Sequence, residues 1–376
     1  MRTIKASEPA ARLIPRIVSW RSGHGTALTV SGYGVRFFVD RGRLVIEDGF
    51  ASEGTRRRTI LSRGTCTLQR IVVVGRTGLI TLDALQWLAD LGIAILFVGV
   101  GGHLTSVFTP GGPEGSKTRL HRIQATARTS EAGVRVAQLL IGRKLLGQTQ
   151  VLEWIAAPGR QIPVAGRHQY ARMGQAAAQV RALYDARIEH PRHLDDIIET
   201  ERAGGQIYWA ALTGIPLRWK PRAAARVPEH WLTTQPRESH RTGNRYGATD
   251  PANALLNYGY ALLEAETRIA CFNAGLHPGL GIVHTDKDGR ASFVYDLMEA
   301  ARPVVDRLML EFIRKHTFAD EECWETREGH CRLDPGLAAR VISWLPRLRS
   351  EVTLVVHEAA IHLRRAAPLG VLGTVR

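Results

Sequence analysis

Short apolar runs separated by turn residues fill residues 27–110. The runs are rich in β-branched and aromatic residues and read "ALTVSGYG", "VRFFVD", "RLVIED", "QRIVVVG" and "IAILFVG". Polar turns such as "DRGR" at 40–43 divide them, which is the pattern of short β-strands. One stretch has a helical period instead and ends at Gly92; its leucines share one stripe, namely Leu82, Leu85, Leu88 and Leu91. This part of the chain therefore predicts a small β-rich domain that carries one helix.

Beyond residue 117 the apolar residues recur with a helical period. Long stretches rich in Ala, Leu and Arg predict helices over 117–157, 167–189, 192–213, 253–274 and 303–316, with more at 334–366. A Pro-rich segment at 217–246 lacks this period and predicts a basic surface loop. We therefore expect an α+β protein of two domains, in which a small β-rich domain (27–110) is followed by a larger all-α domain (117–376), and residues 1–26 form an N-terminal extension.

The net charge of the chain indicates which class of partner it binds. Fifty Lys and Arg residues against 35 Asp and Glu residues leave a net charge of +15. Such an excess favours a polyanionic partner, with nucleic acid ahead of an anionic membrane surface. The longest apolar run, at 93–100, is too short to span a bilayer, and the N-terminus lacks the apolar core of a signal peptide. A cytoplasmic protein without a membrane segment is expected.

Four cysteines in a chain of 376 residues do not form a disulfide framework, which indicates a reducing compartment. Cys323 and Cys331 lie close together in the sequence beside His330, and this grouping raises the possibility of a zinc site. The spacing is not that of a zinc ribbon or finger, and no second pair is present. Ordinary packing explains these residues better than a metal does.

Acidic residues occur in helical stretches that are otherwise apolar. On a helical wheel Glu201 falls in the middle of one narrow face, which it shares with Leu194, Ile198, Gly205, Tyr208 and Leu212. An unpaired carboxylate buried there would cost several kcal/mol or take up a proton. Either a salt bridge or a divalent cation would satisfy it, and its own helix face offers no cationic partner.

A second pair of acids lies in "ASFVYDLMEAARPVVD" at 291–306. Asp296 and Glu299 are three residues apart and therefore neighbours on one side of a helix, among apolar residues. Pro303 suits the first turn of a following helix, so the pair is expected just before a chain break. His284 precedes a "DKDG" turn and is expected on a short extended piece or at a helix start.

Together these segments offer one imidazole and two or three carboxylates, a donor set that suits Mg²⁺ or Mn²⁺ better than zinc. Taken singly, His284 could instead be a hydrogen-bonded core histidine, and Asp296 or Glu299 a charge at a helix N-terminus. The expected burial of Glu201, with no cationic partner on its own helix face, favours a metal site. A basic chain with an acidic metal site is typical of metal-dependent phosphoryl transfer on DNA or RNA.

These segments also carry a family resemblance. The chain resembles the CRISPR-associated adaptation endonucleases and integrases, the "Cas-one" family, in four stretches: "ETERAGGQIYW" at 199–209, "DPANALLNYGYALL" at 250–263, "GLHPGLGIVH" at 275–284 and "ASFVYDLMEAARPVVD" at 291–306. The resemblance extends from about residue 27 to about residue 316. It leaves the first residues and the tail after 317 unmatched.

The resemblance implies which residues act and with which partners. Glu201, His284 and Glu299 would be ligands of Mg²⁺ or Mn²⁺, and Asp296 an acidic neighbour required for catalysis. The family joins 3′-hydroxyl ends of short foreign DNA to a CRISPR repeat, acts as a homodimer, and works with a small dimeric partner, "Cas-two". Two alternatives stay open: a transposase of a mobile element with the same fold, and a catalytically inactive DNA-binding scaffold.

The basic loop is a candidate contact for double-stranded DNA with frayed or branched ends. Its cations are Arg218, Lys220, Arg222, Arg237, Arg241 and Arg245. They alternate with Trp219 and Trp231, and cations beside aromatic rings suit phosphate contact combined with base stacking. The alternative is a solubilising loop held by a few buried anchors.

Overall fold

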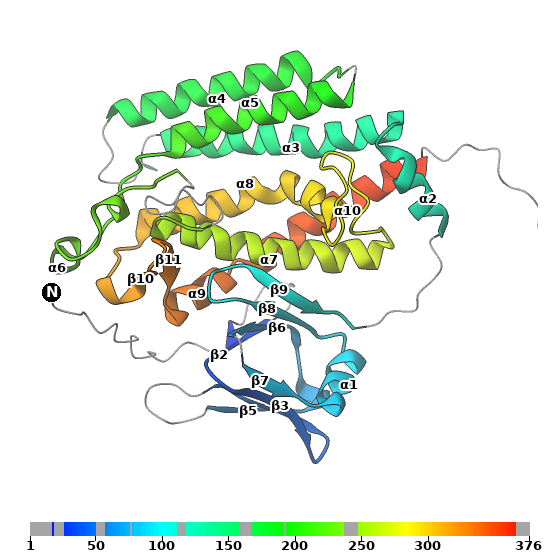
Figure 1. Ribbon diagram of the computed structural model, residues 1–376, viewed down its shortest axis with the longest axis vertical. Helices are drawn as coiled ribbons and strands as arrows, with labels where there is room; N and C mark the ends of the chain where they lie inside the picture. The colour runs from blue at the N-terminus through cyan, green and yellow to red at the C-terminus, as the bar shows by residue number, and fades with distance from the viewer. Residues whose placement is uncertain are drawn as a thin grey trace, which may run out of the picture. The chain divides into compact units, whose positions relative to one another are not determined.

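The computed structural model describes residues 17–18, 26–49, 57–75, 77–110, 118–157, 159, 167–191, 193–236 and 247–365. Figure 1 shows their helices and strands in chain order, from blue to red. The chain divides into two compact units, each assembled from three separate segments. Unit 1 takes its described residues from 1–111, 217–262 and 316–346, and unit 2 takes them from 112–216, 263–315 and 347–376. The predicted domain boundaries follow the chain instead, and they stay a prediction.

Unit 1 contains two larger sheets. The five-stranded sheet has the order β1-β2-β6-β8-β9, with β1 at Ile17–Val18, β2 at Thr26–Ser31, β6 at Leu68–Val74, β8 at Ala94–Val98 and β9 at Leu104–Phe108. The central strands β2, β6 and β8 are parallel, and β1 and β9 are antiparallel edges. Strand β6 is almost continuously apolar and buried from Ile71 to Val74, as expected for a parallel strand covered on both faces.

The four-stranded sheet has the order β5-β4-β3-β7, with β3 at Val35–Asp40, β4 at Arg43–Glu47, β5 at Arg58–Leu61 and β7 at Gly78–Ile80. Helix α1 (Leu82–Asp90) contributes Ala84, Trp87 and Leu88 to the core of this β-rich part. The predicted leucine stripe is wrong at Leu82, which is 84% exposed. The helix begins at this residue, and Trp87 takes the buried position, where its Nε1 atom donates to the carbonyl of Gly42 at 3.1 Å.

The rest of unit 1 combines short helices, a strand pair and loops. It contains α6 (Pro221–Ala224), the first half of α7 (Pro251–Ala274), the antiparallel pair β10 (Cys323–Glu325) and β11 (Cys331–Leu333), and α9 (Pro335–Ile342). Helix α7 begins at the buried carboxylate of Asp250, which accepts from the backbone N–H groups of Ala252 and Asn253. The predicted order, a strand-rich N-terminal region followed by a mostly helical region, is confirmed.

Unit 2 is built from long helices, namely α2 (Thr118–Ala127), α3 (Glu131–Ala156), α4 (Arg167–Arg187), α5 (Leu194–Leu212), α8 (Ser292–Lys315) and α10 (Leu345–Arg365), with the second half of α7. In Figure 1, α4 and α5 lie side by side along α3, and α3 also packs against α8. The helical stretch predicted over 117–157 is two helices. The chain breaks at 128–130, where Ser130 is extended, and Gly133 packs so closely on the carbonyl of Ala127 that no side chain fits.

Helix α8 corrects the prediction that Pro303 begins a new helix. The helix is continuous from Ser292 to Lys315 and contains Pro303 in its interior. Proline lacks the N–H that would bond to the carbonyl four residues earlier, here that of Glu299. Its ring packs on α3, where a Cβ atom added to Gly147 would lie 2.8 Å from the Cβ atom of Pro303. The acids therefore lie inside a long helix and not before a chain break.

Within the described residues, no helix combines the length and the apolar character needed to cross a membrane.

Candidate active site

The loop between α7 and α8 carries His284 and is fixed by one buried carboxylate. Asp296 is fully buried on α8, and it accepts from the backbone N–H groups of Ile282 at 2.5 Å, Val283 at 3.0 Å and His284 at 2.8 Å. A cradle of three N–H groups supplies the hydrogen bonds that a buried carboxyl group needs. Glycine is required at 281, because a Cβ atom there would lie 2.3 Å from the carbonyl oxygen of His284.

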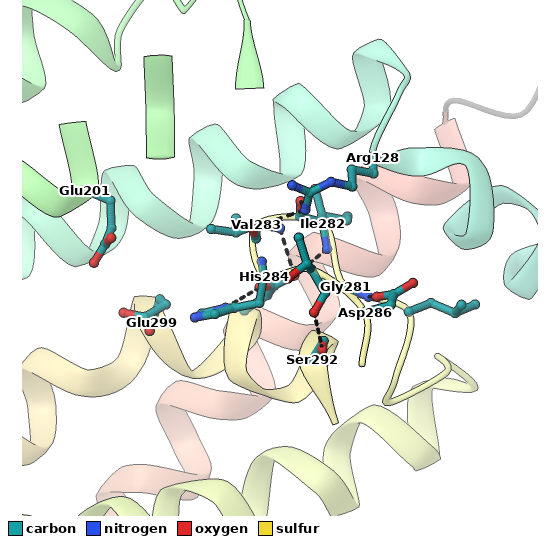
Figure 2. Close-up of polar contacts among 12 residues, drawn as sticks. Arg128, Glu201, Gly281, Ile282, Val283, His284, Asp286, Ser292 and Glu299 are labelled. Atoms are coloured by element: carbon teal, nitrogen blue, oxygen red, sulfur yellow. Dashed lines mark hydrogen bonds and ion pairs between the residues drawn. The ribbon is translucent and has the colours of Figure 1, made fainter. Parts of the chain in front are cut away.

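The same carboxylate orients the histidine ring. The Nδ1 atom of His284 lies 2.7 Å from Oδ1 of Asp296. Since Asp296 already accepts three backbone N–H groups, the hydrogen-bond pattern assigns the donor role to Nδ1 and leaves the lone pair on Nε2. Figure 2 shows the ring reaching from the loop towards Glu299, with Glu201 on the neighbouring helix α5. Asp296 thus acts on the histidine and the loop, and His284 presents a nitrogen that can bind a cation.

Helix α2 and Arg128, the residue that follows it, also hold the loop. The Nη1 atom of Arg128 donates to the carbonyls of Ile282 at 2.6 Å and Val283 at 3.2 Å (Figure 2). One turn earlier, the buried amide of Gln124 donates to the carbonyls of His277 and Leu280 and accepts from the N–H of His277. Both side chains satisfy backbone groups that would otherwise be left unpaired in the loop.

Glu299 on α8 is the most strongly perturbed acid of the group. It is 4% exposed, and its Oε2 atom lies 2.6 Å from Nζ of Lys144, while Oε1 lies 3.4 Å from Nη2 of Arg302. Burial alone would raise the pKa of Glu299, but the charges of Arg302 and Lys144 outweigh it and lower that pKa to about 2. Glu299 is therefore a carboxylate at neutral pH.

Glu201 lies on α5 at the border of the buried face, which corrects its predicted place in the middle of that face. Leu194, Tyr208 and Leu212 are buried as predicted, but in the middle of the helix the buried positions are Ile197, Thr200 and Gly204, each one residue before the predicted Ile198, Glu201 and Gly205. The side chain of Glu201 is 28% exposed and contacts Nζ of Lys144 from α3. The cationic partner that the sequence seemed to lack is therefore supplied by another helix.

Close helix packing brings these groups together. A Cβ atom at Gly204 of α5 would lie 2.5 Å from Cδ2 of Leu145, the residue after Lys144 on α3. The hydroxyl of Tyr208 donates to Oδ2 of Asp306 at 2.9 Å and joins α5 to α8. Small residues and one buried hydrogen bond thus set the positions from which Glu201 and Glu299 reach the same ammonium group.

The donor set of this cluster fits a hard divalent cation. One imidazole and two carboxylates come from three segments, and oxygen-rich sets with one nitrogen suit Mg²⁺ or Mn²⁺. As placed here, no three His, Cys, Asp or Glu side chains of the described residues are arranged to share one metal ion. Between the two carboxylates lies the ammonium of Lys144, so the pair already binds a cation, one that belongs to the protein.

The structure brings together all four predicted site residues, Glu201, His284, Asp296 and Glu299, within unit 2. Sequence reasoning missed four others, namely Gln124, Arg128, Lys144 and Arg302. Only Lys144 left a signal in the sequence. It is a single cation next to Leu145 on the buried face of α3, where a charge needs a partner.

The basic loop lies in unit 1, and its tryptophans are anchors. Trp219 is 9% exposed and Trp231 is 2% exposed; their rings stack, and each indole N–H donates to a backbone carbonyl at 3.1 Å. These two rings are therefore not available to stack on bases, which favours the alternative of a loop held by buried anchors. Among the predicted cations, Lys220 and Arg222 are exposed and Arg218 is half-buried, while Arg237, Arg241 and Arg245 lie outside the described residues.

Cys323 and Cys331 lie on the paired strands β10 and β11, and both are buried. Burial and contact with Cys323 raise the pKa of the Cys331 thiol well above its usual range. A zinc ligand is a thiolate, so a thiol held neutral fits ordinary packing.

Comparison with known proteins places this chain in a family. A family model described as "CRISPR associated protein Cas1" matches residues 28–345, which extends into the tail that the sequence analysis left unmatched. CRISPR-associated endonuclease Cas1 of Korarchaeum cryptofilum is 27% identical over 292 residues, which cover 76% of this chain and 77% of the relative.

Two solved structures have the same fold. A casposase bound to an integration product has a TM-score of 0.70 at 21% identity and covers 91% of both chains. A Cas6-RT-Cas1–Cas2 complex has a TM-score of 0.64 at 17% identity and covers 92% of this chain and 36% of the other. Since the family match spans most of its length, this chain belongs to the Cas1 family of CRISPR-associated proteins.

Proposed function

We propose that this chain is a divalent-metal-dependent DNA endonuclease and integrase of CRISPR adaptation, which joins the 3′-hydroxyl ends of short foreign DNA to a CRISPR repeat. The observation that carries the proposal is the gathering of Glu201 and Glu299 around one cationic group beside the ring of His284, in a member of the Cas1 family. Such a cluster suits phosphodiester chemistry, in which negative charge on the phosphate has to be neutralised.

Each residue has a part in this reaction. Glu201, His284 and Glu299 hold Mg²⁺ or Mn²⁺, and Asp296 keeps the proton on Nδ1 of His284 so that Nε2 can bind. When bound, the cation supplies positive charge at the scissile phosphate and favours the ionised form of the attacking hydroxyl. Asp296 and Arg128 keep the loop of His284 in place, so the geometry exists before DNA arrives.

The partners follow from charge and from the relatives. A net charge of +15 supports binding to the DNA backbone, with Lys220 and Arg222 as exposed candidates for phosphate contact. We further propose that the chain acts in the cytoplasm as a homodimer with a small Cas2 partner. The fold shared with a Cas1–Cas2 assembly supports this partner. Replacing Lys220 and Arg222 by Ala should weaken DNA binding. It should also make the slope of log K against log salt concentration shallower by about two, because about two phosphate contacts are lost.

The deciding experiment is a joining assay. The purified chain, with and without Cas2, is given a labelled short duplex with free 3′-hydroxyl ends and a plasmid that carries a CRISPR repeat. With Mn²⁺ or Mg²⁺ the label should enter the plasmid, and EDTA should prevent it. Glu201→Ala, His284→Ala and Glu299→Ala should each abolish joining and retain most DNA affinity. Glu199→Ala, an exposed acid on the same helix, is the matched control and should join normally.

The same assay separates the alternatives. Joining that is equally efficient on plasmids without a repeat would favour a transposase-like enzyme. Binding without joining, unaffected by all three substitutions, would favour an inactive scaffold. If Glu201→Ala retained full joining, the assignment of Glu201 as a ligand would be wrong.

A further inference from the structure

Lys144 occupies an unusual position for a lysine. It lies on α3 in a helix face that also buries Leu140, Ile141 and Leu145, and it is only 6% exposed. Its ammonium contacts the carboxylates of both Glu201 and Glu299. A lysine is almost never so buried unless it is paired, and here its two partners are the acids assigned to the metal.

The ammonium and a divalent cation require the same oxygen atoms. Two carboxylates brought together in a buried site repel each other, and each loses hydration. Lys144 compensates both effects, and the attraction of Glu299 and Glu201 raises its own pKa against the effect of burial. A divalent ion between the acids would do the same with twice the charge. Both cations cannot bind at once, because they would repel each other at contact distance.

The contact between Lys144 and Glu299 leaves room for exchange with another cation. The buried Oε2 atom of Glu299 lies 2.6 Å from Nζ of Lys144, and the attraction between two opposite charges does not depend on one direction. The lysine stem has four flexible carbons, so its head can move while α3 stays in place.

We propose that Lys144 is an internal counter-cation of the active site: it holds Glu201 and Glu299 together before a divalent cation binds, and it leaves them when that cation enters. The released ammonium then stands at the edge of the site as a positive charge for a phosphate group of the DNA. This inference rests on the proposed metal site, and it adds that the protein itself competes with the metal.

The test is metal binding and stability, with no need for turnover. Binding of Mn²⁺ to the full-length protein without DNA is measured by electron paramagnetic resonance of the free ion and by calorimetry. Lys144→Met should bind Mn²⁺ at least about tenfold more tightly than wild type, a change of about 1.4 kcal/mol. In EDTA its Tm should be lower than that of wild type, and saturating Mn²⁺ should raise its Tm more than it raises that of wild type.

Two controls accompany this variant. Lys315→Met makes the same substitution at an exposed position of the same unit and should leave Mn²⁺ affinity unchanged. Glu299→Gln should abolish binding in both backgrounds. If Lys144→Met does not fold, Lys144→Gln is measured instead, because its neutral amide keeps a donor for the carboxylates.

The possible outcomes are distinct. Tighter binding by the Lys144 variant supports the inference, even where wild type binds too weakly to measure. If the Lys144 variant binds Mn²⁺ no more tightly than wild type, and Glu299→Gln still abolishes binding, the exchange between Lys144 and the metal is wrong. The proposed metal site itself is then retained. Absence of Mn²⁺ binding in wild type and in the Lys144 variant overturns both the inference and the proposed metal dependence.

Discussion

The hydroxyl of Tyr208 on α5 donates a hydrogen bond of 2.9 Å to the buried carboxylate of Asp306 on α8. Tyr208 follows Glu201 by seven residues, and Asp306 follows Glu299 by seven residues. Seven residues are about two helical turns, so the faces that carry the acids also meet at this bond. The bond therefore keeps the two acids at the same level along their helices.

Removing this hydroxyl should destabilise the protein. Tyr208→Phe should lower the free energy of unfolding by about 1–3 kcal/mol, because a buried carboxylate loses a donor. Urea unfolding of Tyr208→Phe, Asp306→Asn and the double variant measures the coupling between the two groups. Effects that simply add would show that the bond does not stabilise the fold.

Asp296 should be required for the orientation of His284 and not for folding as a whole. Asp296→Asn keeps the size of the side chain, but it turns an NH₂ group either towards Nδ1–H or towards the backbone N–H groups. We expect joining to fall by about 10- to 100-fold, as is usual when the partner of a metal-binding histidine is lost. The rate in Mn²⁺ is compared with that of Glu199→Ala. A wild-type rate for Asp296→Asn would contradict this role.

Arg128 should protect the His284 loop from local opening. Hydrogen bonds from charged groups contribute about 1.5–3 kcal/mol, so Arg128→Met should speed amide exchange at residues 282–284 by about tenfold or more. Hydrogen–deuterium exchange with mass spectrometry measures this directly. Arg122→Met, at an exposed arginine of the preceding helix α2, should leave exchange unchanged. Equal protection in the two variants would mean that Arg128 does not protect the loop.

Replacing either of two helical glycines by alanine should change the stability of the protein, and the two changes should have opposite signs. Gly147→Ala would push a methyl group to within 2.8 Å of the rigid ring of Pro303, and overpacking of this kind costs about 1–3 kcal/mol. Gly174→Ala on α4 meets no atom within 4 Å and should stabilise the helix by about 0.4–1 kcal/mol. Tm values of the two variants measure the contrast. A stabilising effect of Gly147→Ala would show that α3 and α8 can move apart freely.

Acid should weaken the metal-free protein partly through Glu299. Its pKa is about 2 when folded against an ordinary value of 4.5, so the unfolded chain binds the proton more readily. Stability that is fully present above about pH 4.5 is therefore lost as the pH falls towards 2. In EDTA, the unfolding free energy of wild type should decline more steeply between pH 5 and pH 3 than that of Glu299→Gln. Parallel slopes would mean that Glu299 does not titrate in this range.

The sequence predicted the elements and most of the acidic cluster. Periodicity located the strands and the long helices, and it placed Asp296 and Glu299 together on a buried face. It chose the wrong phase for α5, because the face that is buried contains Thr200 and Gly204, which carry little hydrophobic signal. Close approach to Leu145 of α3 decides that face, and such packing between helices is not encoded locally.

Lys144 was missed and Pro303 was wrongly placed at a helix start for related reasons. A lysine in a helix usually lies in solvent. Lys144 is buried because it pairs with carboxylates, and one of them, Glu201, is 57 residues away along the chain. A proline usually marks a helix start, and the residue that accommodates it inside α8 is Gly147 on another helix. In both cases the deciding contact is distant along the chain, so local sequence patterns do not identify the residue that supplies it.

The long sequence separation between the residues of the cluster has a consequence for synthesis on the ribosome. The cluster needs α3, α5, the His284 loop and α8, and the last of these is translated only after more than three quarters of the chain has been made. Domains generally fold as they emerge, but contacts of long sequence separation have to wait for their last member. An unfinished polypeptide therefore carries the acid of α5 and the lysine of α3 without the loop and the helix that complete the cluster.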